Sequence, residues 1–137
     1  MLRQDGKPAI DEPAPPRAGT LLSSFGFAFA GLGYCLRTQR NFRIHTAIAV
    51  LGAVAGLLLG LSTVEWAIFV LMCVLVMSAE LVNSMVEALV DLVSPGYHPL
   101  AKVSKDVAAG VVLLTAIGSV IVGLFIFGPR LLAVLHL

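Results

Sequence analysis

Three long apolar segments constrain the fold of this chain more than any other feature of its sequence. They cover residues 44–61, 64–93 and 107–128. A helix of roughly 20 apolar residues is needed to cross the hydrocarbon core of a bilayer. Gly60, Ser62 and Thr63 predict a short turn after the first segment, Ser94-Pro95-Gly96 ends the second, and Gly128-Pro129 closes the third. The sequence therefore predicts an all-α integral membrane protein with three transmembrane helices.

The composition agrees with this class and excludes others. Of the 137 residues, 58% are hydrophobic and 12% are charged, whereas a soluble domain has about 45–50% apolar and about 25% charged residues. An ordinary soluble enzyme is therefore excluded. The formal net charge of +1 gives no reason to expect a nucleic-acid partner. Cys35 and Cys73 lack CxxC spacing, so we expect buried small residues rather than a metal site or a disulfide.

The segment before the first span divides into two parts. Residues 1–19 hold four of the seven prolines and six charged side chains, which is typical of a flexible polar tail and not of a secretory signal. Residues 20–36 are apolar with small residues interleaved, and Phe25 and Phe29 lie on one helical stripe. We expect an amphipathic helix on the membrane surface here, and one membrane domain over residues 20–137.

The basic residues predict the orientation. Arg37, Arg40 and Arg43 precede the first span, and Lys102 and Lys105 lie in the connection between the second and third spans. With three spans, both groups fall on the same side of the membrane, and the other side carries only Glu65 and Arg130. Because cytoplasmic loops are rich in Lys and Arg, we expect the N-terminus and the 94–105 connection to be cytoplasmic.

Four polar residues form a stripe on the second span: Glu80, Asn83, Glu87 and Asp91. Their spacings of 3, 4 and 4 put them on one helix face. Carboxyl groups inside a bilayer normally face a partner or water, and three on one stripe need a counter-charge, protonation or a metal. Oxygen ligands of this kind suit Mg²⁺ shared with phosphates.

The connection after the second span adds cations. We expect the third helix to begin near residue 107, with Lys105 and Asp106 capping its N-terminus, where free N–H groups and Lys102 could bind a phosphate. Carboxylates for Mg²⁺ facing lysines are the parts that phosphoryl transfer needs. Two other interpretations stay open: a solvated structural stripe, which suits Asp91 better than Glu80, and an ion or proton path.

The stripe also carries a family resemblance. Glu80-Leu-Val-Asn83-Ser-Met-Val-Glu87-Ala-Leu-Val-Asp91, then His98 and Lys102-x-x-Lys105-Asp106-x-Ala-Ala, resembles the signature of the small bacterial diacylglycerol kinase and undecaprenol kinase family. The likeness covers roughly residues 22–128. The segment Arg40-Asn41-Phe42-Arg43-Ile44-His45 is more similar to the undecaprenol kinase branch.

The resemblance implies ATP-dependent phosphorylation of a membrane lipid alcohol, with undecaprenol favoured over diacylglycerol. It implies a homotrimeric bundle in the bacterial inner membrane, with Mg²⁺ and active sites between subunits at the cytoplasmic interface. By the same likeness Glu80 is the general base, Glu87 a Mg²⁺ ligand and Asn83 a residue near the substrate and phosphates. The remaining matches are the nucleotide-site residues Asp91, Lys105 and Asp106, and Arg43, which matches a family arginine by position.

One position departs from the family pattern. Where the family often has a metal-binding Glu, this chain has Gln39, whose neutral oxygen could still bind Mg²⁺ or contact the nucleotide. This departure leaves a catalytically silent membrane module open as an alternative, and a small oligomeric ion or proton channel that uses Glu80 also stays open. Outside the motif, we expect His45 and His98 to be boundary residues. Gly52, Gly56 and Gly60 are expected to allow close helix packing.

Overall fold

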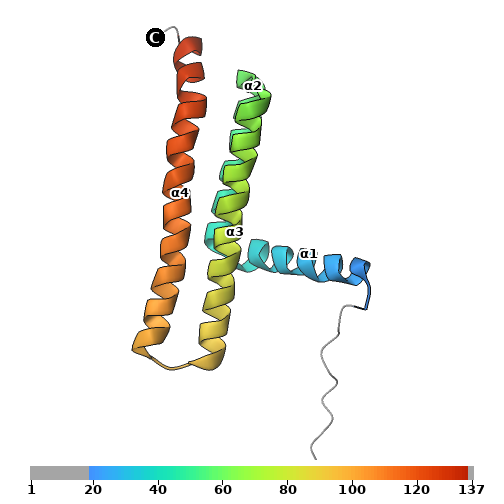
Figure 1. Ribbon diagram of the computed structural model, residues 1–137, viewed down its shortest axis with the longest axis vertical. Helices are drawn as coiled ribbons and strands as arrows, with labels where there is room; N and C mark the ends of the chain where they lie inside the picture. Colours follow the sequence, from blue (N-terminus) through green and yellow to red (C-terminus); the bar gives the residue numbers. More distant parts are fainter. Residues whose placement is uncertain (1–18, 136–137) are drawn as a thin grey trace, which may run out of the picture. The chain divides into compact units, whose positions relative to one another are not determined.

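The computed structural model describes residues 19–135 of the chain and contains four helices and no strand in that range (Figure 1). The helices are α1 (Leu21–Thr38), α2 (Arg40–Leu59), α3 (Thr63–Val93) and α4 (Pro99–Val134). The all-α class and the expected number of helices are confirmed. The polar tail expected over residues 1–19 lies outside the described residues, except for Gly19.

Helices α2, α3 and α4 are each long and apolar enough to cross a membrane. Their outer surfaces carry large aliphatic side chains, such as Leu58, Leu114 and Leu124, which are 82%, 72% and 68% exposed. A soluble protein would bury such groups, since each buried aliphatic side chain contributes about 1.5–3 kcal/mol in water. The chain is therefore a multi-pass membrane protein whose outer faces contact lipid.

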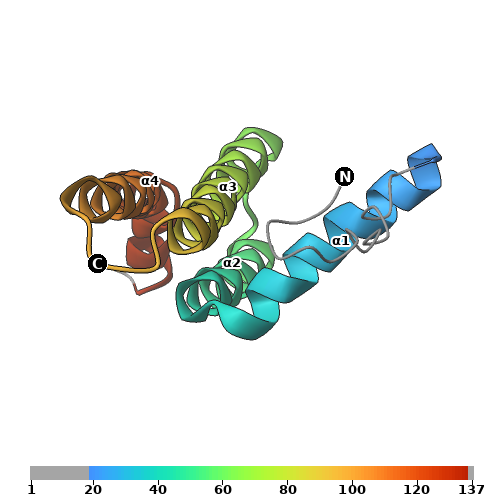
Figure 2. The ribbon, with the colours of Figure 1, turned by 90° about the horizontal axis from the view of Figure 1, so that it is seen from below.

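The three spans run antiparallel in chain order, and α3 is the central element. It packs along α4 over a long interface and also contacts α2, whereas α2 and α4 contact each other less. Figure 2 shows α3 next to both of the other spans. The tightly packed positions are few and include Val76 and Ala79 on α3 and Val112 and Ile126 on α4.

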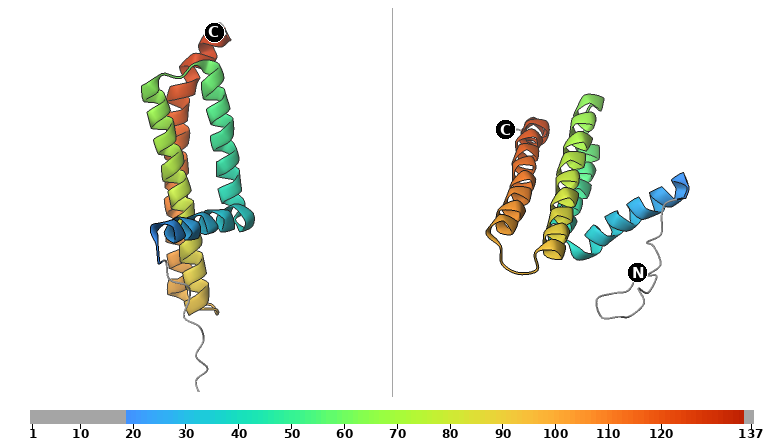
Figure 3. Two further views of the ribbon diagram at one scale, coloured as in Figure 1. Left: turned by 90° about the vertical axis from the view of Figure 1, so that its right-hand side faces the viewer. Right: turned by 60° about the horizontal axis from the view of Figure 1, so that its bottom comes forward.

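The spans differ in length, and this difference positions the polar residues. At 1.5 Å per residue, the 20 residues of α2 span roughly 30 Å and the 31 residues of α3 roughly 46 Å. His45, five residues after the start of α2, contacts Glu80 on α3. Because the helices are antiparallel, α3 passes the level of the start of α2 near residue 85. Residues 86–106, which we term the hairpin end, therefore project beyond α2 (Figures 1 and 3).

The turn between α2 and α3 is built from local capping. Gly60 adopts a left-handed conformation with φ of 66°, which glycine accepts without strain, and it ends α2. Ser62 then begins α3 with a capping box, in which its side chain accepts from the Glu65 N–H while the Glu65 carboxylate accepts from the Ser62 N–H. The predicted turn is confirmed. Gly60, however, is a helix cap and not part of a packing stripe.

The other two glycines of that predicted stripe do allow close packing. A Cβ on Gly52 would lie 2.8 Å from the Phe69 ring, and a Cβ on Gly56 would lie 3.0 Å from Trp66. Phe69 also makes edge-to-face contacts with Trp66 and Phe127, with centroids 5.8 and 6.1 Å apart. Glycine on α2 therefore lets the aromatic residues of α3 approach its backbone.

The start of α4 differs from the prediction. The helix begins at Pro99 and not near residue 107, because His98 caps it through a 3.2 Å hydrogen bond from the Leu100 N–H to Nδ1, and proline suits the first helical turn. Lys105 and Asp106 therefore lie in the second turn and do not cap the N-terminus. Hydropathy alone missed the start of α4 because Lys102, Ser104, Lys105 and Asp106 lower the mean hydropathy of this segment.

The end of α4 also extends further than predicted. Gly128-Pro129 does not close the helix, which continues to Val134 with Pro129 in its interior. Arg130, just past the proline, forms a two-pronged ion pair with Glu65 of α3, with N–O distances of 2.7 and 2.8 Å. This pair fastens the last turns of α4 to the first turn of α3.

Candidate active site

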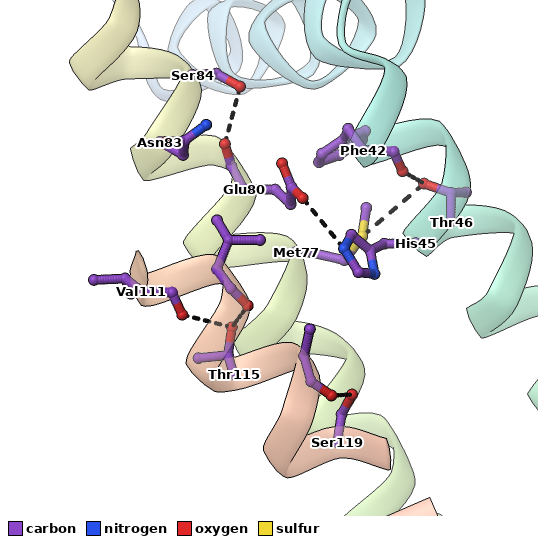
Figure 4. A network of polar contacts seen from close by, with 12 residues as sticks. Phe42, His45, Thr46, Met77, Glu80, Asn83, Ser84, Val111, Thr115 and Ser119 are labelled. Atoms are coloured by element: carbon purple, nitrogen blue, oxygen red, sulfur yellow. Dashed lines mark hydrogen bonds and ion pairs between the residues drawn. The ribbon is translucent and has the colours of Figure 1, made fainter. Parts of the chain in front are cut away.

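Glu80 lies at the buried end of the polar stripe and is the most buried charged residue among those described, at 2% exposure. Its side chain points from α3 toward α2, where Nε2 of His45 lies 3.2 Å from Oε1 (Figure 4). The contact lacks hydrogen-bond geometry, so Oε1 has no hydrogen-bond partner among the described residues. A carboxyl group in such surroundings has unused capacity to accept a proton.

Asn83 and Glu87 follow along the same face. The Asn83 side-chain N–H donates to Oε1 of Glu87 over 3.0 Å. The amide oxygen of Asn83 is buried and has no hydrogen-bond partner among the described residues. Buried polar atoms are almost always paired, and an unpaired one is more typical of a catalytic or ligand site than of a structural core.

The hairpin end brings two of the expected nucleotide-site residues together. Nζ of Lys105 on α4 lies 2.6 Å from Oδ1 of Asp91 on α3. Lys102 pairs with Asp106 one turn further along α4, at 2.5 Å. These pairs are exposed and contribute little to stability, about 0–1 kcal/mol each. Their effect is to hold two lysines and two carboxylates in one place on the projecting hairpin.

Exposure increases steadily along the stripe. Glu80 and Asn83 are buried, Glu87 is half-buried, and the Asp91 side chain is 66% exposed. The stripe therefore connects an apolar environment at Glu80 with a charged, accessible surface at Asp91. Such a site can bring the hydroxyl of an apolar substrate next to a charged, water-soluble substrate.

Two of the predicted site residues do not contact the polar stripe or the paired charges of the hairpin end. Gln39 is the residue before α2, half-buried, and its side chain makes no capping hydrogen bond. Arg43 lies one turn further and is exposed, with no ion pair among the described residues. No hydrogen bond or ion pair joins either side chain to Glu87 within residues 19–135.

A preformed metal cage is absent from the described part of the chain, where no three His, Cys, Asp or Glu residues cluster to hold a metal. Mg²⁺ does not need such a cage, since it is commonly bound by one or two carboxylates together with substrate phosphates. The half-buried Glu87 carboxylate, which accepts a hydrogen bond from the Asn83 amide, is a hard oxygen donor of this kind.

An apolar cavity of about 460 Å³ lies between α2, α3 and α4. His45 lines it, and Gly52, Ala55 and Gly123 are among the small residues along its walls. The cavity extends from the level of Glu80 toward the far ends of the spans, where Leu59 and Leu131 line it. A long apolar chain attached to a group near Glu80 would have space here.

Two contacts between helices are not predicted by the sequence. His45 is expected to be a boundary residue, but it contacts Glu80 in the site. Glu65 and Arg130 stand as isolated charges in the sequence, but they pair at the opposite end of the bundle. The signal for the second feature was in the sequence, because these are the two opposite charges at one end of the bundle. The first required the register of α2 against α3.

The comparisons with known proteins agree with this geometry. A family model described as prokaryotic diacylglycerol kinase matches residues 26–127. The chain is 49% identical to a diacylglycerol kinase of Synechocystis over 119 residues, covering 86% of this chain and 68% of that protein. It is 44% identical to an undecaprenol kinase of Bacillus subtilis, covering 79% of this chain and 88% of that protein. A diacylglycerol kinase of Escherichia coli K12 is 28% identical over 74% of this chain and 83% of its own length.

The chain belongs to the prokaryotic diacylglycerol kinase family. It is a lipid kinase, and this activity implies ATP as the phosphate donor. Membership of the family favours the kinase hypothesis over the ion-path and silent-module alternatives.

Proposed function

We propose that the enzyme transfers the γ-phosphoryl group of ATP to the hydroxyl of undecaprenol, with diacylglycerol as the second candidate acceptor. The observation that carries the proposal is the buried Glu80 carboxylate at the level where α2 begins, with the charged hairpin end directly beyond it. An acceptor hydroxyl at the membrane interface reaches Glu80 from the bilayer, while ATP reaches the hairpin end from water.

In this mechanism Glu80 accepts the proton of the acceptor hydroxyl as the lipid oxygen forms its bond to the γ-phosphorus. The bond between that phosphorus and the β–γ bridging oxygen breaks, and ADP leaves. Lys105, held by Asp91, offsets the charge of the phosphates, and Asp106 positions Lys102 beside it. Positioning and electrostatics supply most of the rate in such transfers.

Glu87 and Asn83 are the residues that would hold Mg²⁺ together with phosphate oxygens, and Gln39 could add a neutral ligand. When bound, the ion would neutralise charge on the β- and γ-phosphates. Arg43, exposed next to the start of α2, is placed in this proposal near the phosphates as a further cation.

Two observations support undecaprenol as the acceptor. The segment Arg40–His45 is similar to the undecaprenol kinase branch, and the relative from Bacillus subtilis is named for that activity. The 49% identical relative is named a diacylglycerol kinase, so the acceptor has to be measured directly. Both lipids have an apolar tail, and the cavity between α2, α3 and α4 has room for part of such a tail.

The deciding experiment is a transfer assay. The purified chain in lipid is supplied with Mg²⁺, labelled ATP and either undecaprenol or diacylglycerol. We expect label in undecaprenyl phosphate at a higher kcat/KM than in phosphatidate. The reverse preference would contradict the undecaprenol assignment, and transfer to neither lipid would contradict the proposed reaction.

We further propose a homotrimer in the bacterial inner membrane, with the N-terminus and the hairpin end in the cytoplasm. The support for the orientation is the excess of Lys and Arg at that end of the bundle. A reporter fused after Leu137 should be extracytoplasmic, and a cytoplasmic reporter would contradict the orientation. Crosslinking in native membranes should give trimers as the largest species.

A further inference from the structure

The proposed mechanism requires a defined position for the Glu80 carboxylate, and the other residues of the polar stripe do not provide it. A glutamate side chain has three rotatable bonds, and on its own it would sample several positions inside the bundle. Within α3 itself, Ser84 donates only to the backbone carbonyl of Glu80, over 2.9 Å. No described side chain of α3 holds the carboxylate.

The neighbouring helix α2 supplies the contact. His45 Nε2 lies 3.2 Å from Glu80 Oε1, and no other ion-pair contact to Glu80 occurs among residues 19–135. We propose that His45 is the positioning residue for Glu80, holding Oε1 so that Oε2 faces the acceptor hydroxyl. This inference rests on the proposed function, in which Glu80 is the base.

The α2 residues that flank His45 are packed into the bundle. Phe42, one turn earlier on α2, is buried at 4% exposure. Thr46, the next residue, donates to the Phe42 carbonyl over 2.7 Å and lies 4.0 Å from the sulfur of Met77 on α3. Figure 4 shows these contacts beside the His45–Glu80 pair. The packing of α2 on α3 therefore brings the His45 side chain to the level of the Glu80 carboxylate.

The other helices offer no competing partner. On α4, the hydroxyls of Thr115 and Ser119 donate to carbonyls of their own helix. On α3, Glu87 repels the charge of Glu80 and so cannot hold it. His45 is thus the one residue in the described range whose side chain forms an ion-pair contact with this carboxylate from another helix.

His45 does not exchange a proton with the substrate in this scheme. The acceptor hydroxyl gives its proton to Oε2 of Glu80, the lipid oxygen bonds to the γ-phosphorus, and ADP leaves with the bridging oxygen. Nε2 remains at Oε1 throughout. Removing the imidazole therefore leaves the base present but misoriented, which lowers the rate of the chemical step without weakening substrate binding.

The test compares two substitutions of His45 with one matched control. His45→Leu removes the ring nitrogen that contacts Glu80, and His45→Gln keeps a polar side-chain nitrogen. Thr46→Val removes only the neighbouring hydroxyl and keeps the shape of the side chain, so α2 stays packed on α3. We expect kcat to fall by roughly 10- to 100-fold in His45→Leu, as for a misplaced catalytic group. The KM values for lipid and ATP should stay within about threefold. His45→Gln should recover part of the loss, and Thr46→Val should keep the wild-type kcat.

A second measurement separates positioning from general damage to the fold. In the Glu80→Gln background there is no base to orient, so adding His45→Leu should cause little further loss of the residual rate. Thermal unfolding of each variant in the same detergent reports its stability. Independent, multiplicative losses in the double variant would overturn the inference, because they indicate that His45 acts elsewhere.

Further outcomes would overturn either the role of His45 or the proposed function. A wild-type kcat in His45→Leu would overturn the inference, as would a change confined to the KM for lipid, which would make His45 a substrate contact. Equal losses in His45→Leu and Thr46→Val would overturn it too, because both would then reflect altered helix packing. If the wild-type protein itself transfers no phosphate to either lipid, the proposed function fails rather than the role of His45.

Discussion

At the scale of single residues, the chemistry of the site concentrates on one carboxyl group. Glu80 is buried in an otherwise apolar part of the bundle, and one of its oxygens lacks a hydrogen bond. We expect Glu80→Gln to lower kcat by at least about 10²-fold, the lower range for removing a general base. Glutamine preserves the shape of the side chain, so the fold and ATP binding should be retained. Transfer assays and nucleotide titration on the same preparation check this, and near-normal turnover would remove Glu80 as the base.

Gln39 gives a second prediction at this scale. It stands next to the start of α2 without a capping hydrogen bond, so its side chain is free to change. Gln39→Glu adds a carboxylate, which binds Mg²⁺ more strongly than a neutral amide oxygen. We expect activity to be retained and half-maximal rate to be reached at a lower Mg²⁺ concentration. The matched control is Gln39→Ala, which should need more Mg²⁺ than the wild type. Complete loss of activity in Gln39→Glu would contradict the role.

The residue scale also shows what the sequence could and could not predict. The spacing of Glu80, Asn83, Glu87 and Asp91 was enough to place them on one helix face, because helix periodicity depends only on the local chain. The pairing of Glu80 with His45 could not be predicted, because it depends on how α2 and α3 align. The same limit applies to Lys105 and Asp91, which meet only once the hairpin is formed.

At the scale of elements, the ends of helices were harder to predict than their existence. Hydropathy identifies the part of a helix that lies in lipid, whereas α4 continues on both sides of that part. His98 and Pro99 determine its start, and the ion pair of Arg130 with Glu65 secures its end. Helices α3 and α4 are thus longer than the parts that cross the membrane. Their extensions carry the charged residues of the site, such as Asp91 and Lys105.

The contact between α2 and α3 gives a prediction about stability. A methyl group on Gly52 would lie 2.8 Å from the Phe69 ring, which Trp66 and Phe127 hold in place. Gly52→Ala should therefore destabilise the bundle by about 1–3 kcal/mol, as overpacking does. Gly118→Ala on α4 is the matched control, since no atom lies within 4 Å of its added Cβ. Thermal unfolding in detergent should show a lower midpoint for Gly52→Ala than for Gly118→Ala. Equal midpoints would contradict the close contact between Gly52 and Phe69.

At the scale of the whole molecule, the three spans combine two environments in one small chain. The hairpin end carries paired charges beyond the start of α2, and the cavity of about 460 Å³ lies in the apolar part of the bundle. Glu80 and His45 lie between them, and His45 lines the cavity. An enzyme that transfers a phosphoryl group from a nucleotide to a lipid needs both environments. The lipid stays in the bilayer and the nucleotide stays in water.

The cavity therefore carries the last prediction. Gly123 lines it, and a Cβ added there meets no atom within 4 Å, so a larger side chain would extend into open space. If the acceptor tail lies in the cavity, Gly123→Leu should raise the KM for undecaprenol by roughly 10-fold, the effect of losing about 1.4 kcal/mol of binding. The KM for ATP should not change, because the nucleotide binds at the hairpin end. Gly118→Leu on the same helix, outside the cavity lining, is the control. An unchanged KM for the lipid in Gly123→Leu would mean that the tail stays in the bilayer and only the hydroxyl end enters the protein.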